Sequence, residues 1–252
     1  MKKHNLLSKS FELTTSNVDA NNVATSKFLL QAFQDVATLH ADHLGFGWDA
    51  LNADKKLWVV SKIAVEVLRP VMLGDSVVVS TWPVAPNKFF ADRHYQMCLA
   101  DGTVLVNAIS RWCIIDFDTR KMANPMLESQ KYYDGEYLEK VSGATFEAKK
   151  VVLDDSFELS YTKQVRWTDL DLNHHVNNTN YVDIAVDSLS SNYLLGKYVS
   201  AFELTYHGEC RFGDQVHVYS KLVDGEHKVV GQKNGATCFT YTANYKNLQQ
   251  LL

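Results

Sequence analysis

Residues 61–79 read Ser61-Lys-Ile-Ala-Val-Glu-Val-Leu-Arg-Pro-Val-Met-Leu-Gly-Asp-Ser-Val-Val-Val79, and residues 200–218 read Ser200-Ala-Phe-Glu-Leu-Thr-Tyr-His-Gly-Glu-Cys-Arg-Phe-Gly-Asp-Gln-Val-His-Val218. The two segments align without a gap and share a Gly-Asp step, at residues 74–75 and at residues 213–214. Apolar residues alternate before and after that step, which is the pattern of a strand, a turn and a second strand. An internal repeat of this length indicates a chain built from two similar halves.

A similar lead-in precedes both copies of the repeat. Polar turns at residues 17–21 and 169–173 each come before a helical apolar stripe, with helix N-caps expected near Thr25 and near Asn177. The first stripe comprises Phe28, Leu29, Ala32, Phe33, Val36 and Leu39, and the second comprises Tyr181, Ile184, Ala185, Ser188 and Leu189. Each half therefore reads as a long helix followed by antiparallel strands, an α+β arrangement in which a sheet curls round a helix.

The repeat also divides the chain. We expect an N-terminal domain over residues 1–125 and a C-terminal domain over residues 153–252. The segment between them, residues 126–152, is rich in charge and carries two glycines. It therefore reads as a linker that lies outside the core.

Length and composition exclude several classes of protein. The chain has 252 residues, a formal net charge of −4 and a sequence pI near 6.1, so no overall positive field favours nucleic acid. No apolar run approaches the ~18 residues that a membrane span needs, and the start of the chain lacks the apolar run of a signal peptide. The four cysteines are scattered without a Cys-x-x-Cys pair, which argues against a zinc site and a disulfide scaffold. We expect reduced thiols in a cytoplasmic protein.

The densest polar cluster lies at residues 169–175, which read Asp-Leu-Asp-Leu-Asn-His-His. If this stretch is extended, the side chains that share its polar face are Asp169, Asp171, Asn173 and His175. The helix expected from about Asn177 would direct its free N–H groups and its positive dipole end at them. A carboxylate, an amide, an imidazole and a helix N-terminus in one place could bind and stabilise a developing oxyanion.

The same cluster also fits a solvated acidic turn that caps a helix. The corresponding first-half segment, residues 17–23, has no histidine and aligns only if one residue is dropped near His175. Since capping is achieved there without a histidine, the second copy favours a functional interpretation. His40 and His43, three residues apart on the first helix, lack a third ligand, so we expect partly buried or surface side chains and no metal site.

A second candidate is the adjacent pair Glu209 and Cys210, which stands where the first copy has Pro-Val at residues 70–71. Neighbouring strands would bring Glu209 beside His175, whereas the alternation of a strand turns Cys210 towards the apolar core. A bulge at Gly208 would reverse that order. Burial and the adjacent carboxylate are expected to raise the pKa of the Cys210 thiol, which would make it a poor nucleophile at neutral pH. Alone, the pair also fits a surface glutamate and a small buried cysteine.

Residues 166–181, which read Arg-Trp-Thr-Asp-Leu-Asp-Leu-Asn-His-His-Val-Asn-Asn-Thr-Asn-Tyr, resemble the signature of the acyl-acyl carrier protein (acyl-ACP) thioesterases of bacteria and plant plastids. Residues 57–61 and 204–210 are also similar to that family, and the resemblance extends from about Phe11 to Tyr245. It implies a tandem double hot dog, in which each half is an antiparallel sheet wrapped around a long helix. The catalytic residues that it implies are Asp171, Asn173, His175 and Glu209. Cys210 matches a cysteine once proposed as the family's nucleophile.

The implied reaction is hydrolysis of the thioester between a fatty acyl chain and the phosphopantetheine arm of the carrier, which releases a free fatty acid without a cofactor or a metal. In this scheme Glu209 acts with His175 as general base on water, Asn173 orients the water or the substrate, and Asp171 fixes the loop. The first half would supply only the wall of the acyl tunnel. An acyl-CoA thioesterase with the same chemistry and a non-catalytic acyl-binding protein are the alternatives.

The chain differs from the plant members of the family in two ways, and both concern the organism and compartment from which it comes. His207-Gly208 stands where plant members often have two basic residues, and the chain begins directly at the first copy without a plastid transit segment. Both favour a bacterial, cytoplasmic enzyme. The expected partner is an acidic acyl carrier protein docked through a local basic patch, with no nucleic acid and no membrane span. The oligomeric state stays open, and a homodimer is one of the options.

Overall fold

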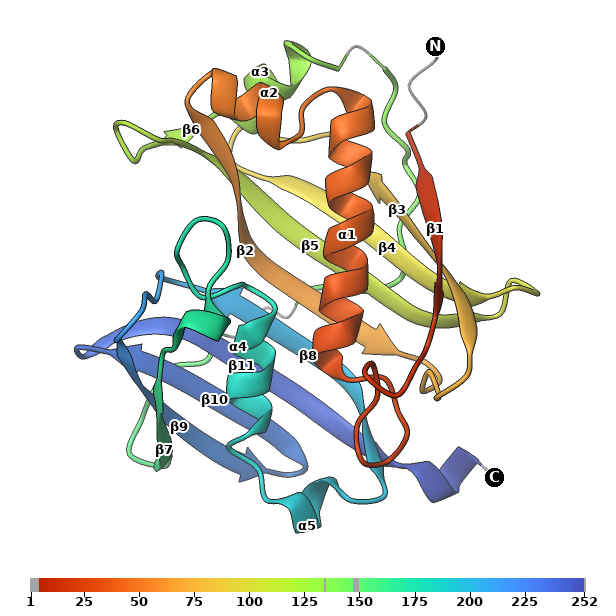
Figure 1. The fold of residues 1–252 in the computed structure, drawn as a ribbon, viewed down its shortest axis with the longest axis vertical. Coiled ribbons are helices and arrows are strands. Elements are labelled where there is room, and N and C mark those ends of the chain that lie inside the picture. Colours follow the sequence, from red (N-terminus) through yellow and green to blue (C-terminus); the bar gives the residue numbers. More distant parts are fainter. Residues whose placement is uncertain (1–4, 134, 147–149, 252) are drawn as a thin grey trace.

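The computed structural model describes residues 5–133, 135–146 and 150–251 and has one large antiparallel sheet (Figure 1). Its strands lie in the order β1-β3-β4-β5-β2-β8-β11-β10-β9-β7, with β6 paired to β5. The first-half strands are β1 (Leu7–Glu12), β2 (Lys56–Val67), β3 (Ser76–Pro83), β4 (Ala91–Leu99), β5 (Val104–Asp116) and β6 (Met122–Ala123). The second-half strands are β7 (Glu158–Gln164), β8 (Lys197–Tyr206), β9 (Gln215–Val223), β10 (Glu226–Lys233) and β11 (Ala236–Asn247).

The two halves meet where β2 pairs with β8, and the internal repeat is visible in that pairing. Ala64 and Glu203 occupy equivalent positions in the two copies, and they are direct partners in the β2–β8 register. An approximate two-fold axis therefore passes through the middle of the sheet. The Lys62 Nζ lies 2.7 Å from Glu203 Oε1 and ties the strands together at this point.

The repeated Gly-Asp step also folds the same way in both halves. Gly74 and Gly213 have φ angles of 89° and 84°, which an L side chain adopts only under strain. Asp75 Oδ2 accepts the Met72 amide at 2.8 Å, and Asp214 Oδ2 accepts the Arg211 amide at 2.7 Å. The prediction of a strand, a turn and a strand is confirmed in both copies.

Helices α1 (Ser26–Leu44) and α4 (Asn180–Val186) cover the same face of the sheet, one in each half (Figure 1). Thr25 caps α1 by accepting the Phe28 amide, as predicted, and Gly45 ends the helix with a φ of 86°. Leu39, expected in the buried stripe, is 43% exposed because it lies on the outer side of α1.

A long helix was expected in the second half as well as in the first, and for the second half this prediction is wrong. Helix α4 has seven residues, against 19 in α1, and it begins at Asn180, three residues later than expected. Each helix is followed by a short one before the next strand, α2 (Trp48–Ala53) in the first half and α5 (Ser191–Leu194) in the second. The first half therefore has the longer helical layer.

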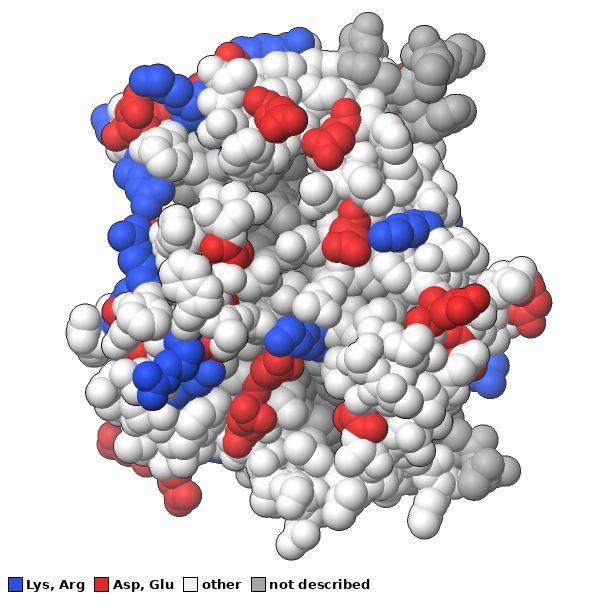
Figure 2. Space-filling view, in the orientation of Figure 1, with Lys and Arg blue, Asp and Glu red and all other residues white. Residues whose placement is uncertain are grey.

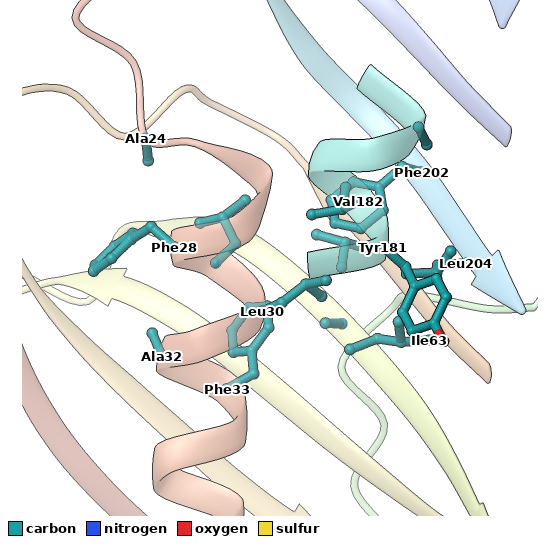
Figure 3. Packing of buried hydrophobic residues seen from close by; sticks show 14 of the residues in the cluster. Ala24, Phe28, Leu30, Ala32, Phe33, Ile63, Tyr181, Val182, Phe202 and Leu204 are labelled. Carbon is teal, nitrogen blue, oxygen red and sulfur yellow. The ribbon is translucent and has the colours of Figure 1, made fainter. Parts of the chain in front are cut away.

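The two helices and the sheet share one apolar core (Figure 3). Leu30 of α1 and Val182 of α4 point towards each other across the gap between the helices, and both are 4% exposed or less. Phe202 and Leu204 of β8 lie beneath α4, while Ile63 of β2 continues the same layer. The core is continuous across the joint, so the halves pack as one body.

The segment expected to be a linker packs against the first half. It opens with α3 (Pro125–Gln130), and its Ser142 is 5% exposed. Ser142 Oγ donates to the Ala108 carbonyl at 2.9 Å, and the Trp82 indole donates to the Lys140 carbonyl at 2.7 Å. The view of residues 126–152 as outside the core is therefore wrong for these parts, while residues 134 and 147–149 lie outside the described residues. Among the helices described, none is long and apolar enough to cross a membrane.

Candidate active site

The polar cluster forms a tight turn, so the extended conformation on which the shared polar face depended is not present. The Asp171 amide donates to the His175 carbonyl at 2.8 Å, and the His174 amide donates to the Asp171 carbonyl at 3.0 Å. His174 has a φ of 61°, which lets the chain reverse. The Asp171 carboxylate accepts the Asn173 amide at 2.8 Å and the His175 amide at 3.4 Å, so it holds the turn from inside.

Asp169 is not a member of the cluster that this turn assembles. Its carboxylate accepts the Arg166 amide at 2.7 Å and lies 3.0 Å from the Lys163 ammonium. It thus caps the short 3₁₀ helix η1 (Trp167–Asp169). In an extended strand the side chains of Asp169 and Asp171 would lie on the same face. The turn places them apart.

The first half contains the same turn, residue for residue. The Asp19 carboxylate accepts the Asn21 amide at 2.8 Å and the Val23 amide at 3.2 Å, and Asn22 has a φ of 60°. Val23 therefore occupies the place of His175. The expected one-residue gap is wrong, because both turns superpose on the same hydrogen-bond pattern.

Glu209 and His175 meet at the end of β8. The Glu209 Oε2 lies 3.1 Å from His175 Nε2, and the two side chains are 44% and 20% exposed. Glu209 was expected on a strand, yet it follows the last residue of β8 in an irregular stretch. The amides of His207 and Gly208 both donate to the Cys238 carbonyl, at 2.8 and 3.1 Å, which is a bulge-like step.

Cys210 faces the opposite way and is 0% exposed. Its amide donates to the Tyr181 hydroxyl at 3.2 Å inside the core. The prediction of a raised thiol pKa is wrong: hydrogen bonding with the Cys238 thiol lowers the pKa of Cys210 to about 7, against the effect of burial. Tyr181 and Lys233 act in the same direction as Cys238.

A cavity of about 1150 Å³ opens between the turn at 171–175 and the helical layer of the first half. Its wall includes Ala37 and Ala41 of α1, Leu51 of α2, and Trp58 of β2. On the other side lie Asn173, His175, Asn178, Tyr206 and Glu209, whereas Cys210 does not line it. The acid, the imidazole and the amide are therefore brought together at one end of a largely apolar chamber.

The corresponding turn of the first half is closed by its own contacts. In the first half the Asn21 side chain donates to the carbonyls of Leu194 and Lys197, both at 3.0 Å, and accepts the Gly196 amide at 2.9 Å. It thus closes the joint between its own turn and the turn before β8. The side-chain amide of Asn173 has no such contact within the described residues. Helices α1 and α2 are longer than α4 and α5, so the turn that follows α2 lies farther from the turn at 171–175.

The N–H groups at the start of α4 are less free than expected. The amides of Val176, Asn177 and Thr179 are all bonded to neighbouring chain, to the Cys210 carbonyl, the Asp169 carbonyl and the Asn177 side chain. Asn178 lines the cavity, and its backbone amide has no hydrogen-bond partner among the described residues. The carbonyl of the same peptide unit, that of Asn177, accepts the Asn180 amide at 2.9 Å, and the next carbonyl, that of Asn178, accepts the Tyr206 hydroxyl at 3.0 Å.

Comparison with known proteins decides the family. Residues 4–132 match the profile "Acyl-ACP thioesterase N-terminal domain", and residues 153–246 match "Acyl-ACP thioesterase C-terminal domain". The chain belongs to the acyl-ACP thioesterase family. The resemblance noted in the sequence is confirmed.

Two plant relatives of this thioesterase-family chain illustrate its distance from them. The palmitoyl-acyl carrier protein thioesterase of Gossypium hirsutum is 27% identical over 215 residues, which cover 81% of this chain and 52% of the relative. The oleoyl-acyl carrier protein thioesterase 1 of Arabidopsis thaliana is 25% identical over 260 residues, which cover 97% and 70%. Both are named as chloroplastic. The chain spans about half the length of the first of these relatives.

Solved structures share the fold. An acyl-ACP thioesterase of Bacteroides thetaiotaomicron has a TM-score of 0.86 at 24% identity, covering 98% of this chain and 100% of that one. The 12:0-ACP thioesterase of Umbellularia californica has a TM-score of 0.87 at 21% identity, covering 97% and 98%. The expected tandem double hot dog is confirmed.

Two residues of the site escaped sequence reasoning. Arg120 and Arg211 each place an Nη2 atom 3.4 Å from the Glu209 Oε2. Arg120 comes from the first half, which was expected to supply only a wall. No local pattern signals it, because its place beside Glu209 depends on how the β5–β6 turn meets the second half.

His40 and His43 differ in burial. His40 is fully buried beside Arg93, with His40 Nδ1 3.0 Å from Arg93 Nη1, so the expectation of partial burial is wrong for it. His43 is exposed. Within the described residues no group of three or more His, Cys, Asp or Glu side chains could hold a metal ion.

Proposed function

We propose that the protein hydrolyses the thioester that joins a fatty acyl chain to the phosphopantetheine arm of an acyl carrier protein, releasing the free acid. The observation that carries this proposal is the pair of Glu209 and His175, 3.1 Å apart at one end of a cavity of about 1150 Å³. An apolar chamber of that size suits an acyl chain, and the hydrolytic pair lies where its thioester would be. Membership of the acyl-ACP thioesterase family supports the same reaction.

In the mechanism that we propose, Glu209 and His175 remove a proton from a water molecule as the water oxygen attacks the thioester carbon. The carbon–sulfur bond breaks, and the proton passes back to the departing thiolate. A positioned general base contributes ~10²–10⁴ in rate. The Asn173 amide orients the water or the substrate, and Asp171 acts indirectly by holding the turn in shape.

The unpaired Asn178 amide is the proposed donor to the oxyanion. Asn178 and His175 both line the cavity, and the peptide that carries the donor is held through its carbonyl, Asn177 O, which accepts the Asn180 amide at 2.9 Å. A fixed backbone donor needs no reorganisation as charge develops on the oxygen, and losing such a donor typically costs ~10²–10³ in kcat. The remaining amides at the start of α4 are occupied within the loop.

A carrier protein is the partner that we propose over coenzyme A. Figure 2 shows lysine and arginine side chains in a column along the left edge of this face, although the net charge is −4. Carriers of this class are acidic, so a local column of cations favours docking. Raising the salt concentration should lower kcat/KM for the acyl carrier and leave kcat/KM for acyl-pantetheine unchanged, because exposed charges are screened over ~8 Å at physiological salt. Equal salt responses would contradict carrier docking.

The decisive experiment offers the protein a panel of acyl carriers and acyl-CoA thioesters of graded chain length and measures the fatty acid released. Release from the carriers at higher kcat/KM than from coenzyme A supports the proposal. Preference for coenzyme A would transfer the same chemistry to the other carrier. No release from any substrate would contradict hydrolysis and leave an acyl-binding role.

The cytoplasm is the location that we propose. The four cysteines are all free thiols, three of them buried, as is typical of proteins in a reducing compartment. The relatives named above are chloroplastic, so fractionation of the source cells is the direct test.

A further inference from the structure

Among the described residues, Arg120 is the one residue of the first half that forms an ion pair with the Glu209 carboxylate. It belongs to the turn between β5 and β6, while Glu209 follows β8 in the other half. The Nη2 of Arg120 and the Nε2 of His175 both address the same oxygen, Oε2, at 3.4 and 3.1 Å. The carboxylate is thus held from two sides, one from each half of the molecule.

The turn that presents Arg120 is built firmly. The Asp116 carboxylate accepts both the amide and the hydroxyl of Thr119 at 2.8 Å, and the Arg120 amide donates to the Asp116 carbonyl at 2.9 Å. The Phe117 amide donates to the Lys55 carbonyl at 2.8 Å, which joins the turn to the end of the helical layer, and the exposed Lys55 ammonium lies 2.7 Å from Asp118. Arg120 therefore starts from a fixed backbone position.

The backbone of Arg120 is strained. Its φ is 56°, in the left-handed region that favours glycine, and strained residues of this kind gather at functional sites. A glycine would satisfy this turn at lower conformational cost. The Arg120 side chain extends from this turn to Glu209.

A second, smaller cavity lies beside Glu209, and residues of both halves line it. A cavity of about 450 Å³ is lined by Ile115 and Arg120 from the first half and by Gly208, Glu209, Arg211 and Lys233 from the second. Lys233 is committed elsewhere, because its ammonium donates to the Glu209 carbonyl at 2.7 Å and to Asp214 at 2.9 Å. It fixes the main chain of Glu209, which leaves the carboxylate to the two arginines and His175.

We infer that Arg120 is a positioning residue that reaches across the joint and orients the Glu209 carboxylate towards His175 and the attacking water. The inference rests on the proposed hydrolysis and extends it, since the first half then contributes to catalysis and not only to the wall of the cavity. Arg211 also lies 3.4 Å from the same oxygen, but it is two residues from Glu209 in the same half, so its contact does not link the two halves.

The test is the variant Arg120→Gly, which keeps the left-handed backbone of the turn and removes only the side chain. On both acyl-pantetheine and the acyl carrier we expect kcat to fall about 10-fold to 100-fold, part of the ~10²–10⁴ that a positioned base supplies, with KM nearly unchanged. Added guanidinium ion should restore part of the lost kcat. The matched control is Lys121→Gln, which removes a neighbouring cation of the same hairpin and should keep the wild-type kcat.

Three results would overturn the inference. The first is a kcat of Arg120→Gly within twofold of wild type on both substrates. The second is a loss confined to KM for the acyl carrier, which would assign Arg120 to docking. The third is a crystal structure of the variant in which Glu209 stays 3.1 Å from His175 in an unchanged rotamer. If the wild-type protein released no acid at all, the proposed function would fail, and this structure would still decide the role of Arg120.

Discussion

Glu209 and Cys210, which are adjacent in the sequence just after β8, face opposite directions, and this decides which of them can act on a substrate. Glu209 opens onto the cavity beside His175, while Cys210 is sealed in the core against Tyr181. A lowered thiol pKa favours a nucleophilic thiolate, so electrostatics alone would not exclude Cys210. Access does, because a side chain that is 0% exposed cannot reach a thioester in the cavity.

The first prediction compares Glu209→Gln with Cys210→Ala. The first variant should lose two or more orders of magnitude in kcat, since the amide cannot accept the proton of water, on the ~10²–10⁴ scale of a general base. The second should keep most of its kcat and form no acyl-enzyme. Both are measured as released acid, with mass spectrometry of the quenched reaction to look for a covalent adduct. An acyl group trapped on Cys210 would reverse the assignment.

Among the structural elements, the two matching turns show one motif with two uses. In the first half the turn at 19–23 locks the halves together through Asn21, and in the second the turn at 171–175 faces the cavity. Both are held by an aspartate that accepts the same two amides. The difference arises from the opposing helices and not from the turns themselves.

The second prediction compares the corresponding asparagines of the two turns, Asn21 and Asn173. Asn21→Ala removes three hydrogen bonds to the turn before β8 and should lower the free energy of unfolding by about 1–3 kcal/mol, with kcat little changed. Asn173→Ala should do the opposite and lower kcat at nearly constant stability. Urea unfolding and acid release are measured for both variants. If Asn21→Ala lost as much kcat as Asn173→Ala while fully folded, the division of labour would be wrong.

The third prediction concerns β10 and the end of α4. His227 is fully buried, its Nε2 lies 2.9 Å from the Ser188 Oγ, and burial lowers its pKa to about 4. In the unfolded chain the pKa is 6.5, so between pH 6.5 and about 4 the unfolded state binds more protons and stability falls as the pH falls. Over this window His227 should account for a loss of about 3 kcal/mol.

The variant His227→Leu should remove most of that pH dependence. Urea unfolding of both proteins at pH 7, 6, 5 and 4.5 gives the comparison, and the quantity of interest is the change with pH and not the value at pH 7. Parallel curves for the two proteins would show that other groups govern the loss at low pH.

The whole molecule is a duplicated fold whose two halves are unequal, and this inequality makes the cavity. The sequence predicted the repeated strands, because their pattern depends on neighbours along the chain. It also predicted the opposite facing of Glu209 and Cys210, but both residues lie beyond β8, where the alternation of a strand no longer applies. It could not predict the turn at 171–175, whose left-handed His174 breaks the alternation, nor the shortness of α4. Arg120 was also beyond it, since the contact with Glu209 arises only when the two halves pack.

The last prediction concerns the length of that cavity, and it uses two residues of α1. Ala41 lines the chamber, so Ala41→Phe should fill part of it and exclude the longest acyl chains. One methylene that no longer fits is worth about 1–3 kcal/mol, so kcat/KM for the longest accepted substrate should fall about tenfold or more while shorter chains are spared. Leu39→Phe is the control, because Leu39 is exposed on the outer side of the same helix. Equal losses at every chain length would mean that the acyl chain lies elsewhere.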